Sequence, residues 1–244
     1  MPPRRVSVPE SAIVLAAGRG KRMGALTDAR PKPLITVEGR ALIDHVLDHL
    51  ATAGVKRVVV NLHYMGDAIA AHLVRRRDIA VEFSREDQAL ETGGGIAKAL
   101  PLLGDVFFAL NADIFWLGGA MSALHQLAAG FDPARDDALL LMQPTARAAG
   151  YDGPGDFMLD PAGIVRRRLE TEVAPFVFAG IEIVHHRLFD GAPTGAFSIN
   201  RLWDAAIERG RLRGLVHDGE WYHVGTPESL ALAEARLHTH RVER

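Results

Sequence analysis

The residues best suited to chemistry begin with a glycine loop from Leu15 to Gly24, which reads Leu-Ala-Ala-Gly-Arg-Gly-Lys-Arg-Met-Gly. Glycines let backbone N–H groups approach anionic oxygens closely, and Arg19, Lys21 and Arg22 add positive charge. The loop is not a Walker loop, because no Ser or Thr follows Lys21. It is not a dinucleotide fingerprint either, because Met23 occupies the place of the third glycine. A plain strand-to-helix turn is the alternative, but three cations favour a phosphate-binding loop.

Two further groups could act on the same phosphates. In Pro31-Lys32-Pro33-Leu34 the prolines restrict the backbone on both sides of the lysine, so its ammonium group could be aimed at a phosphoryl group. A surface turn is the alternative. Asn111-Ala112-Asp113 follows the apolar run 106–110, where a carboxylate could hold a divalent ion or simply cap the next turn.

The remaining motifs are less specific. Glu91-Thr-Gly-Gly-Gly-Ile96 places three glycines at the start of an expected helix, where a base or a ribose could lie against the backbone; a flexible loop is the alternative. His185-His186 lacks a third metal ligand at useful spacing, which favours a structural role. Arg75–Arg77 and Arg166–Arg168 are interpreted as solvated charge runs, with substrate contact as the less favoured alternative. No Gly-x-Ser-x-Gly elbow is present, which disfavours a serine hydrolase.

The elements that must position these residues alternate along the first half of the chain. Apolar runs typical of strands buried on both faces occur at 12–17, 58–62 and 106–110. Between them, helices are expected at 42–50, 64–76 and 92–100, the first stopped by Gly54. This alternation predicts an α/β fold with a Rossmann-like, mostly parallel sheet flanked by helices. The glycine loop follows the first strand, where such sheets bind ligands.

The pattern changes after about residue 140. Gly150 to Gly163 is rich in Gly, Asp and Pro, and the runs 177–178 and 181–184 predict paired strands. Ser198 and Thr226 are expected to cap two further helices. We expect a loose leader at residues 1–11 and a single domain at 12–240. Its first half (12–145) would bind the nucleotide, and its second half (146–240) is smaller and mixed.

Composition narrows the class of protein. The 244 residues include 28 Lys plus Arg and 30 Asp plus Glu, a formal net charge of -2, which argues against nucleic acid as the main partner. The absence of cysteine excludes disulfides, thiolate zinc sites and cysteine nucleophiles. No apolar run approaches the ~20 residues of a membrane helix, and the first apolar stretch is too short for a signal peptide. We therefore expect a cytoplasmic protein with no membrane partner.

Taken together, the motifs resemble those of the sugar-1-phosphate nucleotidyltransferases. That family's signature, Leu-Ala-Ala-Gly-x-Gly-x-Arg-Met followed by Pro-Lys-Pro-Leu, is found here at Leu15–Met23 and Pro31–Leu34. Further landmarks occur in the family's order at Glu91–Gly95, Asn111–Asp113, Gly155–Phe157, Phe178–Gly180 and Trp221–Thr226. The resemblance spans residues 12–235. It implies a glycosyltransferase-A-like fold whose smaller half binds the sugar, and transfer of a nucleotidyl group from a nucleoside triphosphate to a sugar 1-phosphate.

Within the family, Leu90-Glu-Thr-Gly-Gly-Gly-Ile96 and the short chain are most similar to the uridylyltransferases that use N-acetylmuramate α-1-phosphate in peptidoglycan recycling. This likeness implies UTP as the triphosphate. A mannose-1-phosphate guanylyltransferase or another relative is the alternative, although these more often carry Leu-Gly-Thr-Ala-Gly at that place. A relative that binds nucleotide without turnover is a further alternative. Because no C-terminal β-helix follows, we expect a monomer or a homodimer.

The resemblance implies roles for particular residues. Arg22, Lys32 and Asp113 would be catalytic, with Arg22 on the departing phosphates and Lys32 between the α-phosphate and the sugar phosphate. The residues implied to bind the nucleotide are Leu15, Ala16, Ala17, Gly18, Gly20, Arg22, Glu86, Gly93, Gly94 and Asn111. Those implied to bind the sugar are Gly155, Asp156 and Gly180.

The resemblance also implies Mg²⁺, with Mn²⁺ as the alternative, held by Asp113 and His223. His223 departs from the family pattern, which usually has Asp in a Trp-x-Asp-x-Gly-Thr segment. Imidazole is a poorer ligand for Mg²⁺ than for Mn²⁺ or Zn²⁺. Either His223 acts through a water molecule or a softer metal, or Asp113 holds the ion largely alone. Ala112 replaces the central glycine of the family's Asn-Gly-Asp triplet.

Overall fold

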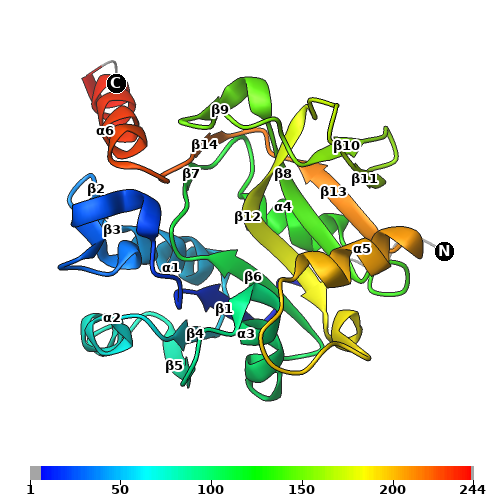
Figure 1. Ribbon diagram of the computed structural model, residues 1–244, viewed down its shortest axis with the longest axis horizontal. Coiled ribbons are helices and arrows are strands. Elements are labelled where there is room, and N and C mark those ends of the chain that lie inside the picture. Colours follow the sequence, from blue (N-terminus) through cyan, green and yellow to red (C-terminus); the bar gives the residue numbers. More distant parts are fainter. Residues whose placement is uncertain (1–6, 243–244) are drawn as a thin grey trace.

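The computed structural model describes residues 7–242, and Figure 1 labels the helices and strands that these residues form. Six of the predicted leader's residues, 1–6, lie outside this range. The α-helices are α1 (Leu42–Ala53), α2 (Gly66–Leu73), α3 (Glu91–Ala99), α4 (Ala123–Gly130), α5 (Asn200–Glu208) and α6 (Pro227–Val242). The strands of the first half are β1 (Ser11–Leu15), β2 (Thr36–Val37), β3 (Arg40–Ala41), β4 (Arg57–Leu62), β5 (Ala80–Arg85), β6 (Val106–Asn111), β7 (Phe115–Leu117) and β8 (Ala138–Pro144). Those of the second half are β9 (Ala148–Ala149), β10 (Phe157–Leu159), β11 (Val165–Arg167), β12 (Phe176–His185), β13 (Leu212–Val216) and β14 (Glu220–Tyr222).

A nine-stranded sheet forms the centre of the fold and confirms the predicted α/β class. Seven strands follow the order β11-β10-β12-β6-β1-β4-β5, while β8 pairs with β12 and β13 pairs with β8. The strands β6, β1, β4 and β5 are all parallel, because helical crossovers connect them. Strand β12 runs antiparallel to β6 and joins the second half of the chain to the first.

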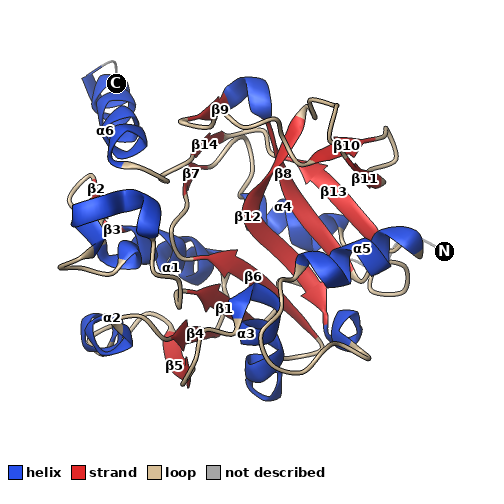
Figure 2. Cartoon of the chain, viewed as in Figure 1, coloured by secondary structure: helices blue, strands red, loops and turns tan. Residues whose placement is uncertain are grey.

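Helices cover both faces of this sheet, as Figure 2 shows. Alternate residues of β1 enter different cores, because successive side chains of a strand point to opposite faces. Ala12 and Val14 pack with α1, α2 and α4, whereas Ile13 packs with α3 and α5. A third core joins Met23 of the glycine loop to β14 and α6. Three hydrophobic cores therefore hold β1 and the glycine loop that follows it.

The predicted strands of the first half are confirmed as β1, β4 and β6. The helix expected at 42–50 is confirmed as α1, which ends at Gly54 with a left-handed φ of 95°. The helix expected at 64–76 is shorter, because α2 begins only after Met65, whose φ is also positive. The cap predicted at Thr226 is confirmed, since its Oγ1 accepts a hydrogen bond from Ser229 N at 3.3 Å.

One prediction about the second half is wrong. The runs 177–178 and 181–184 are not two paired strands but parts of one strand, β12. Gly180 lies between them with a φ of 78°, where the pairing of β12 with β8 shifts register. A glycine inside a strand often marks such a bulge. In the sequence, the same glycine indicated a turn between two strands. No helix in the described part of the chain combines the length and the apolar character needed to cross a membrane.

Candidate active site

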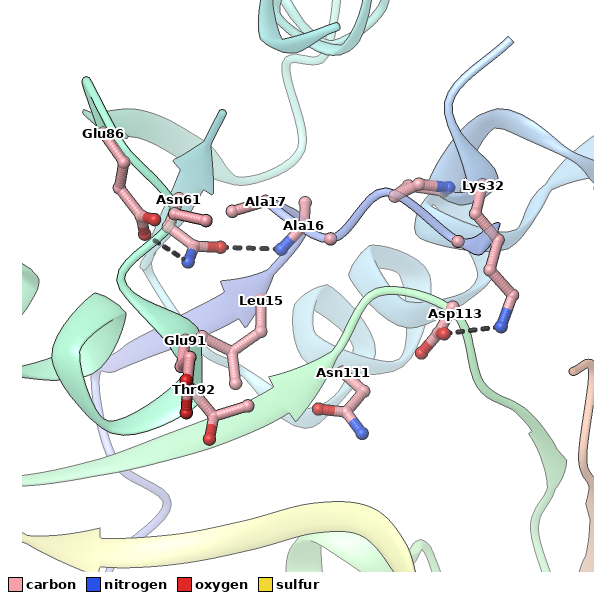
Figure 3. A pocket seen from close by; sticks show the side chains of 14 residues that line it. Leu15, Ala16, Ala17, Lys32, Asn61, Glu86, Glu91, Thr92, Asn111 and Asp113 are labelled. Carbon is pink, nitrogen blue, oxygen red and sulfur yellow. Dashed lines mark hydrogen bonds and ion pairs between the residues drawn. The ribbon is translucent and has the colours of Figure 1, made fainter. Parts of the chain in front are cut away.

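The carboxyl edge of the parallel strands forms the first of three adjoining cavities. Leu15 at the end of β1 lies in register with Asn61 of β4 on one side and with Asn111 of β6 on the other. Two amide side chains therefore flank the start of the glycine loop. This first cavity has a volume of about 270 Å³. Figure 3 shows its walls, formed by Leu15, Ala16, Ala17, Gly18, Gly20, Lys32, Pro33, Asn61, Glu86, Ala89, Glu91, Thr92, Asn111 and Asp113.

A buried hydrogen-bond relay fixes the start of the glycine loop (Figure 3). Ala16 N donates to Asn61 Oδ1 at 2.7 Å, and Asn61 Nδ2 donates to Glu86 Oε1 at 2.7 Å. Leu90 N donates to the second carboxylate oxygen of Glu86 at 3.0 Å. Asn61 and Glu86 are only 2% and 6% exposed, so these bonds are shielded from water and strengthened by the low local dielectric. Glu86 thus lines the first cavity and also ties the segment 86–90 to β4.

Lys32 and Asp113, the predicted catalytic pair, form an ion pair in the same cavity (Figure 3). Lys32 Nζ lies 2.6 Å from Asp113 Oδ2; the lysine side chain is 7% exposed and the aspartate side chain 38%. The lysine begins a 3-10 turn, Lys32–Leu34, with proline directly before and after it. Gly20 has a φ of 64°, and a Cβ there would lie 2.9 Å from Lys32 Cβ. Only glycine therefore lets the loop pass over the lysine stem.

A third cavity, of about 160 Å³, lies beyond this ion pair. Met23 is fully buried beside Tyr222 and Val224, which anchors the glycine loop to the segment after β14. This anchoring brings together three charged residues and a histidine from four separate segments. They are Arg22, Lys32, Asp113 and His223. Arg22, Lys32 and Asp113 are thus gathered around one cavity, whereas Arg19 and Lys21 line a separate hollow beside Tyr64.

His223 is positioned by packing. Its ring stands edge-on to Tyr151, with 6.0 Å between centroids, and a Cβ on Gly225 would lie 2.3 Å from its Nε2. Burial, and then the positive charges of Arg22 and Lys32, lower the pKa of the imidazole. The ring is therefore neutral at pH 7. Among the described residues there is no group of three or more His, Asp or Glu that could hold a metal ion.

The second cavity, of about 280 Å³, opens between β12 and α5. It shares Leu15, Thr92 and Asn111 with the first cavity, and Asn111, Phe178 and Gly180 with the third. Asp156 and Gly180, both predicted to bind the sugar, lie in its wall. A Cβ on Gly180 would lie 2.9 Å from Asn111 Nδ2, so the bulge in β12 brings bare backbone against Asn111. The other lining residues are Ala109, Asn111, Phe157, Arg167, Phe178, Glu182, Ser198, Ile199, Asn200 and Trp203.

Three glycines predicted to lie in the site line none of these three cavities. Gly93 N and Gly94 N both donate to Phe197 O, at 2.9 and 3.1 Å. A Cβ on Gly93 would lie 2.3 Å from Phe197 Cε2, and one on Gly94 would lie 2.3 Å from Gly195 O. These glycines make room for the segment 195–197 against α3. Gly155 likewise packs on a carbonyl oxygen, because its Cβ would lie 2.2 Å from Ala174 O.

Four of the site residues that were not predicted from the sequence have polar groups in the cavities or close to them. Asn61 and Glu182 are polar residues inside apolar runs of buried strands, a signal that was available. Arg167 belongs to a run interpreted as solvated charge, yet it lines the second cavity. Trp203 was expected only as an apolar residue of its helix, and it also donates a hydrogen bond from Nε1 to Glu182 Oε2 at 3.0 Å.

The carboxyl edge of a parallel sheet, a glycine loop with nearby cations and a lysine–carboxylate pair define a nucleotide-binding protein of the α/β class. Residues 12–186 match the model of the MobA-like NTP transferase domain, and the chain belongs to this family of nucleotidyltransferases. It is 43% identical to N-acetylmuramate alpha-1-phosphate uridylyltransferase of Caulobacter vibrioides, over 94% of this chain and 97% of that one. The protein of the same name from Neisseria meningitidis is 35% identical over 92% and 96%. A crystal structure of UDP-glucose pyrophosphorylase complexed with UDP-glucose superposes with a TM-score of 0.79 at 14% identity, covering 95% of this chain and 99% of that one.

Proposed function

We propose that the protein transfers the uridylyl group of UTP to N-acetylmuramate α-1-phosphate, giving UDP-N-acetylmuramate and pyrophosphate. The observation that carries the proposal is the convergence of Arg22, Lys32 and Asp113 on one cavity beside the glycine loop. The choice of UTP and of this sugar is supported by two relatives that match along nearly their whole length.

The proposed reaction is an in-line displacement. A phosphate oxygen of the sugar 1-phosphate forms a bond to the α-phosphorus of UTP, while the bond to the β-phosphate bridging oxygen breaks and its electron pair leaves with pyrophosphate. The attacking oxygen is already ionised at pH 7, so no general base is required. The main obstacle is the repulsion between two polyanions, and the ammonium group of Lys32 is placed to offset it. Arg22, on the glycine loop, is placed to neutralise the departing pyrophosphate.

Asp113 and His223 could hold a divalent ion only if substrate phosphates and water supplied the remaining ligands. Asp113 offers a partly exposed carboxylate to the first and third cavities, and His223 offers a neutral imidazole to the third. Mg²⁺ is commonly held by one or two carboxylates together with substrate phosphates and water, so Asp113 suffices on the protein side. When bound, the ion would supply neutralisation of phosphate charge. We propose Asp113 as the principal ligand.

The substrates are tested by incubating the purified protein with Mg²⁺ and each of UTP, GTP and CTP. Each triphosphate is paired with N-acetylmuramate α-1-phosphate or mannose 1-phosphate, and released pyrophosphate is measured. We expect the fastest release from UTP with the muramate. Faster release from GTP with mannose 1-phosphate would overturn the assignment. Tight triphosphate binding without any release, with Mg²⁺ or Mn²⁺, would show a binding protein instead.

The metal assignment predicts different losses at Asp113 and His223. EDTA should stop pyrophosphate release, and added Mg²⁺ should restore it. Asp113→Asn should lower kcat/KM about 10²- to 10³-fold, the typical cost of losing one strong electrostatic contact. His223→Ala should cost less than tenfold, because the principal ligand remains. Equal losses in the two variants would contradict a site held mainly by Asp113.

A further inference from the structure

The wall of the second cavity combines three aromatic rings with polar side chains, and the one cation among its lining residues is Arg167 of β11. Its guanidinium lies 4.6 Å from the ring centre of Phe157 and 5.8 Å from that of Trp203. Nε donates to Asp204 Oδ1 at 2.8 Å and Nη2 donates to Asn200 Oδ1 at 2.9 Å. These contacts hold the guanidinium in one orientation. Within residues 7–242 no hydrogen-bond acceptor is found for Nη1, and the side chain is 34% exposed.

Glu182, in the wall of the same cavity, does not oppose the charge of a bound anion. The side chain is buried, and its hydrogen bond within the described residues comes from Trp203 Nε1. Burial raises the pKa of this carboxyl group to about 8, and the bond from Trp203 offsets only part of that increase. Glu182 is therefore a neutral acid at pH 7 and can donate a hydrogen bond into the cavity.

Two other features complete the electrostatics of the second cavity. Asp156 accepts a hydrogen bond from Phe178 N at 2.9 Å through Oδ2, which leaves a carboxylate suited to sugar hydroxyl groups. The start of α5 contributes Ser198, Ile199 and Asn200 to the wall, and its first turn contains no acidic residue. The positive end of a helix dipole thus lies on the same side as Arg167 and favours an anion there.

We propose that Arg167 determines the specificity for the sugar by binding a carboxylate attached to the sugar ring. The second cavity would then select acidic sugar 1-phosphates over neutral ones. The inference rests on the proposed function, because it needs a sugar 1-phosphate to lie between Lys32 and β12. N-acetylmuramate meets the requirement, since it differs from N-acetylglucosamine by a lactyl ether that carries one carboxylate. A guanidinium fork is the side chain best matched to such a group.

The experiment compares two substrates that differ only in this ether: the α-1-phosphates of N-acetylmuramate and of N-acetylglucosamine, each with UTP. Arg167→Gln should raise KM for the muramate by about tenfold to a hundredfold, the range expected for a lost hydrogen bond between charged groups. Its KM for the glucosamine should stay within about threefold, because no carboxylate is present. Arg166→Gln is the matched control: Arg166 is the preceding residue, pairs with Glu172 on the surface and should leave both KM values unchanged.

A purely structural Arg167 would give a different result. The guanidinium joins β11 to α5 through its hydrogen bond to Asp204. Asp204→Asn weakens this connection but keeps the guanidinium, so KM for the muramate should not rise. Equal losses on both sugars in Arg167→Gln, or a raised muramate KM in Asp204→Asn, would overturn the inference. If the unmodified protein releases no pyrophosphate from UTP with either sugar, it is the proposed function that fails.

Discussion

The first and second cavities meet at Leu15, Thr92 and Asn111, but they are built in different ways. The first draws on polar groups at strand ends, fixed by the relay through Asn61 and by the ion pair of Lys32. The second gathers aromatic and polar side chains from β10, β11, β12 and α5. The polar groups of the first cavity are thus held by hydrogen bonds and an ion pair, as the alignment of phosphates in the proposed reaction requires. In the second cavity, the proposed discrimination between sugars depends on a few side chains.

The largest expected loss of activity follows from removing the ion pair of the first cavity. Lys32→Ala should keep the fold, because the partner carboxylate is partly exposed and can be solvated. It should lower kcat/KM about 10²- to 10³-fold, because the repulsion between the two substrates is no longer offset. Lys56→Ala is the control: this exposed lysine precedes β4, at the opposite edge of the sheet. Near-normal turnover of Lys32→Ala in a steady-state assay would contradict the role given to the lysine.

The next prediction compares alanine substitutions at two glycines near the first cavity, Gly95 and Gly18, by their effects on stability and on UTP binding. A Cβ on Gly95 would lie 2.7 Å from Asn61 Nδ2 and 2.9 Å from Glu86 Oε1, so Gly95→Ala must disturb the relay. A disturbed buried hydrogen bond costs about 1–3 kcal/mol, more than the ~1 kcal/mol that alanine gains as a helix former. We therefore expect a lower free energy of unfolding, measured in urea, together with weaker binding of UTP.

Gly18→Ala is the matched comparison, since a Cβ there has no protein atom within 4 Å. Its free energy of unfolding should change by less than about 0.5 kcal/mol, as for ordinary surface substitutions. UTP binding, measured by titration calorimetry, should nevertheless weaken, because Gly18 lines the first cavity and a methyl group there takes up space for the ligand. Equal destabilisation by the two substitutions would refute the distinction between a glycine that the relay needs and a glycine that the ligand needs.

The difference between the first and second cavities also explains which site residues could be predicted from the sequence. Lys32 and Asp113 belong to short contiguous motifs at the ends of recognisable strands, so their chemistry and approximate position were predictable. Arg167 stands in a run of three arginines and Glu182 in an apolar strand, so neither belongs to a recognised site motif. Only the pairing of β11 with β10 and of β12 with β6 brings them to one cavity. The three glycines of the Glu91–Ile96 motif suggested room for a base. They serve the packing of the segment 195–197 and of the relay, which depend on contacts distant in sequence.

The last prediction concerns the buried acid of the second cavity, Glu182, and its effect on the free energy of unfolding. Glu182 has a pKa of about 8 in the fold against an ordinary value of 4.5. Between these values the unfolded chain loses the proton while the folded protein keeps it. The folded state then binds more protons, so the free energy of unfolding falls as pH rises, by up to about 1.4 kcal/mol per pH unit. Below pH 4.5 this loss is absent, because both states are protonated.

Glu182→Gln replaces the neutral acid by an amide of similar shape that still accepts the hydrogen bond from Trp203. Its free energy of unfolding should differ least from that of the unmodified protein near pH 4 and exceed it increasingly toward pH 8, as measured by urea unfolding at several pH values. Glu172→Gln is the control. Glu172 is held by Arg166 at the surface and its pKa is lowered, so it titrates below this window. A constant difference between Glu182→Gln and the unmodified protein across pH 5 to 8 would show that Glu182 is ionised in the fold. The second cavity would then carry an additional negative charge, and its preference for an acidic sugar would lose its electrostatic basis.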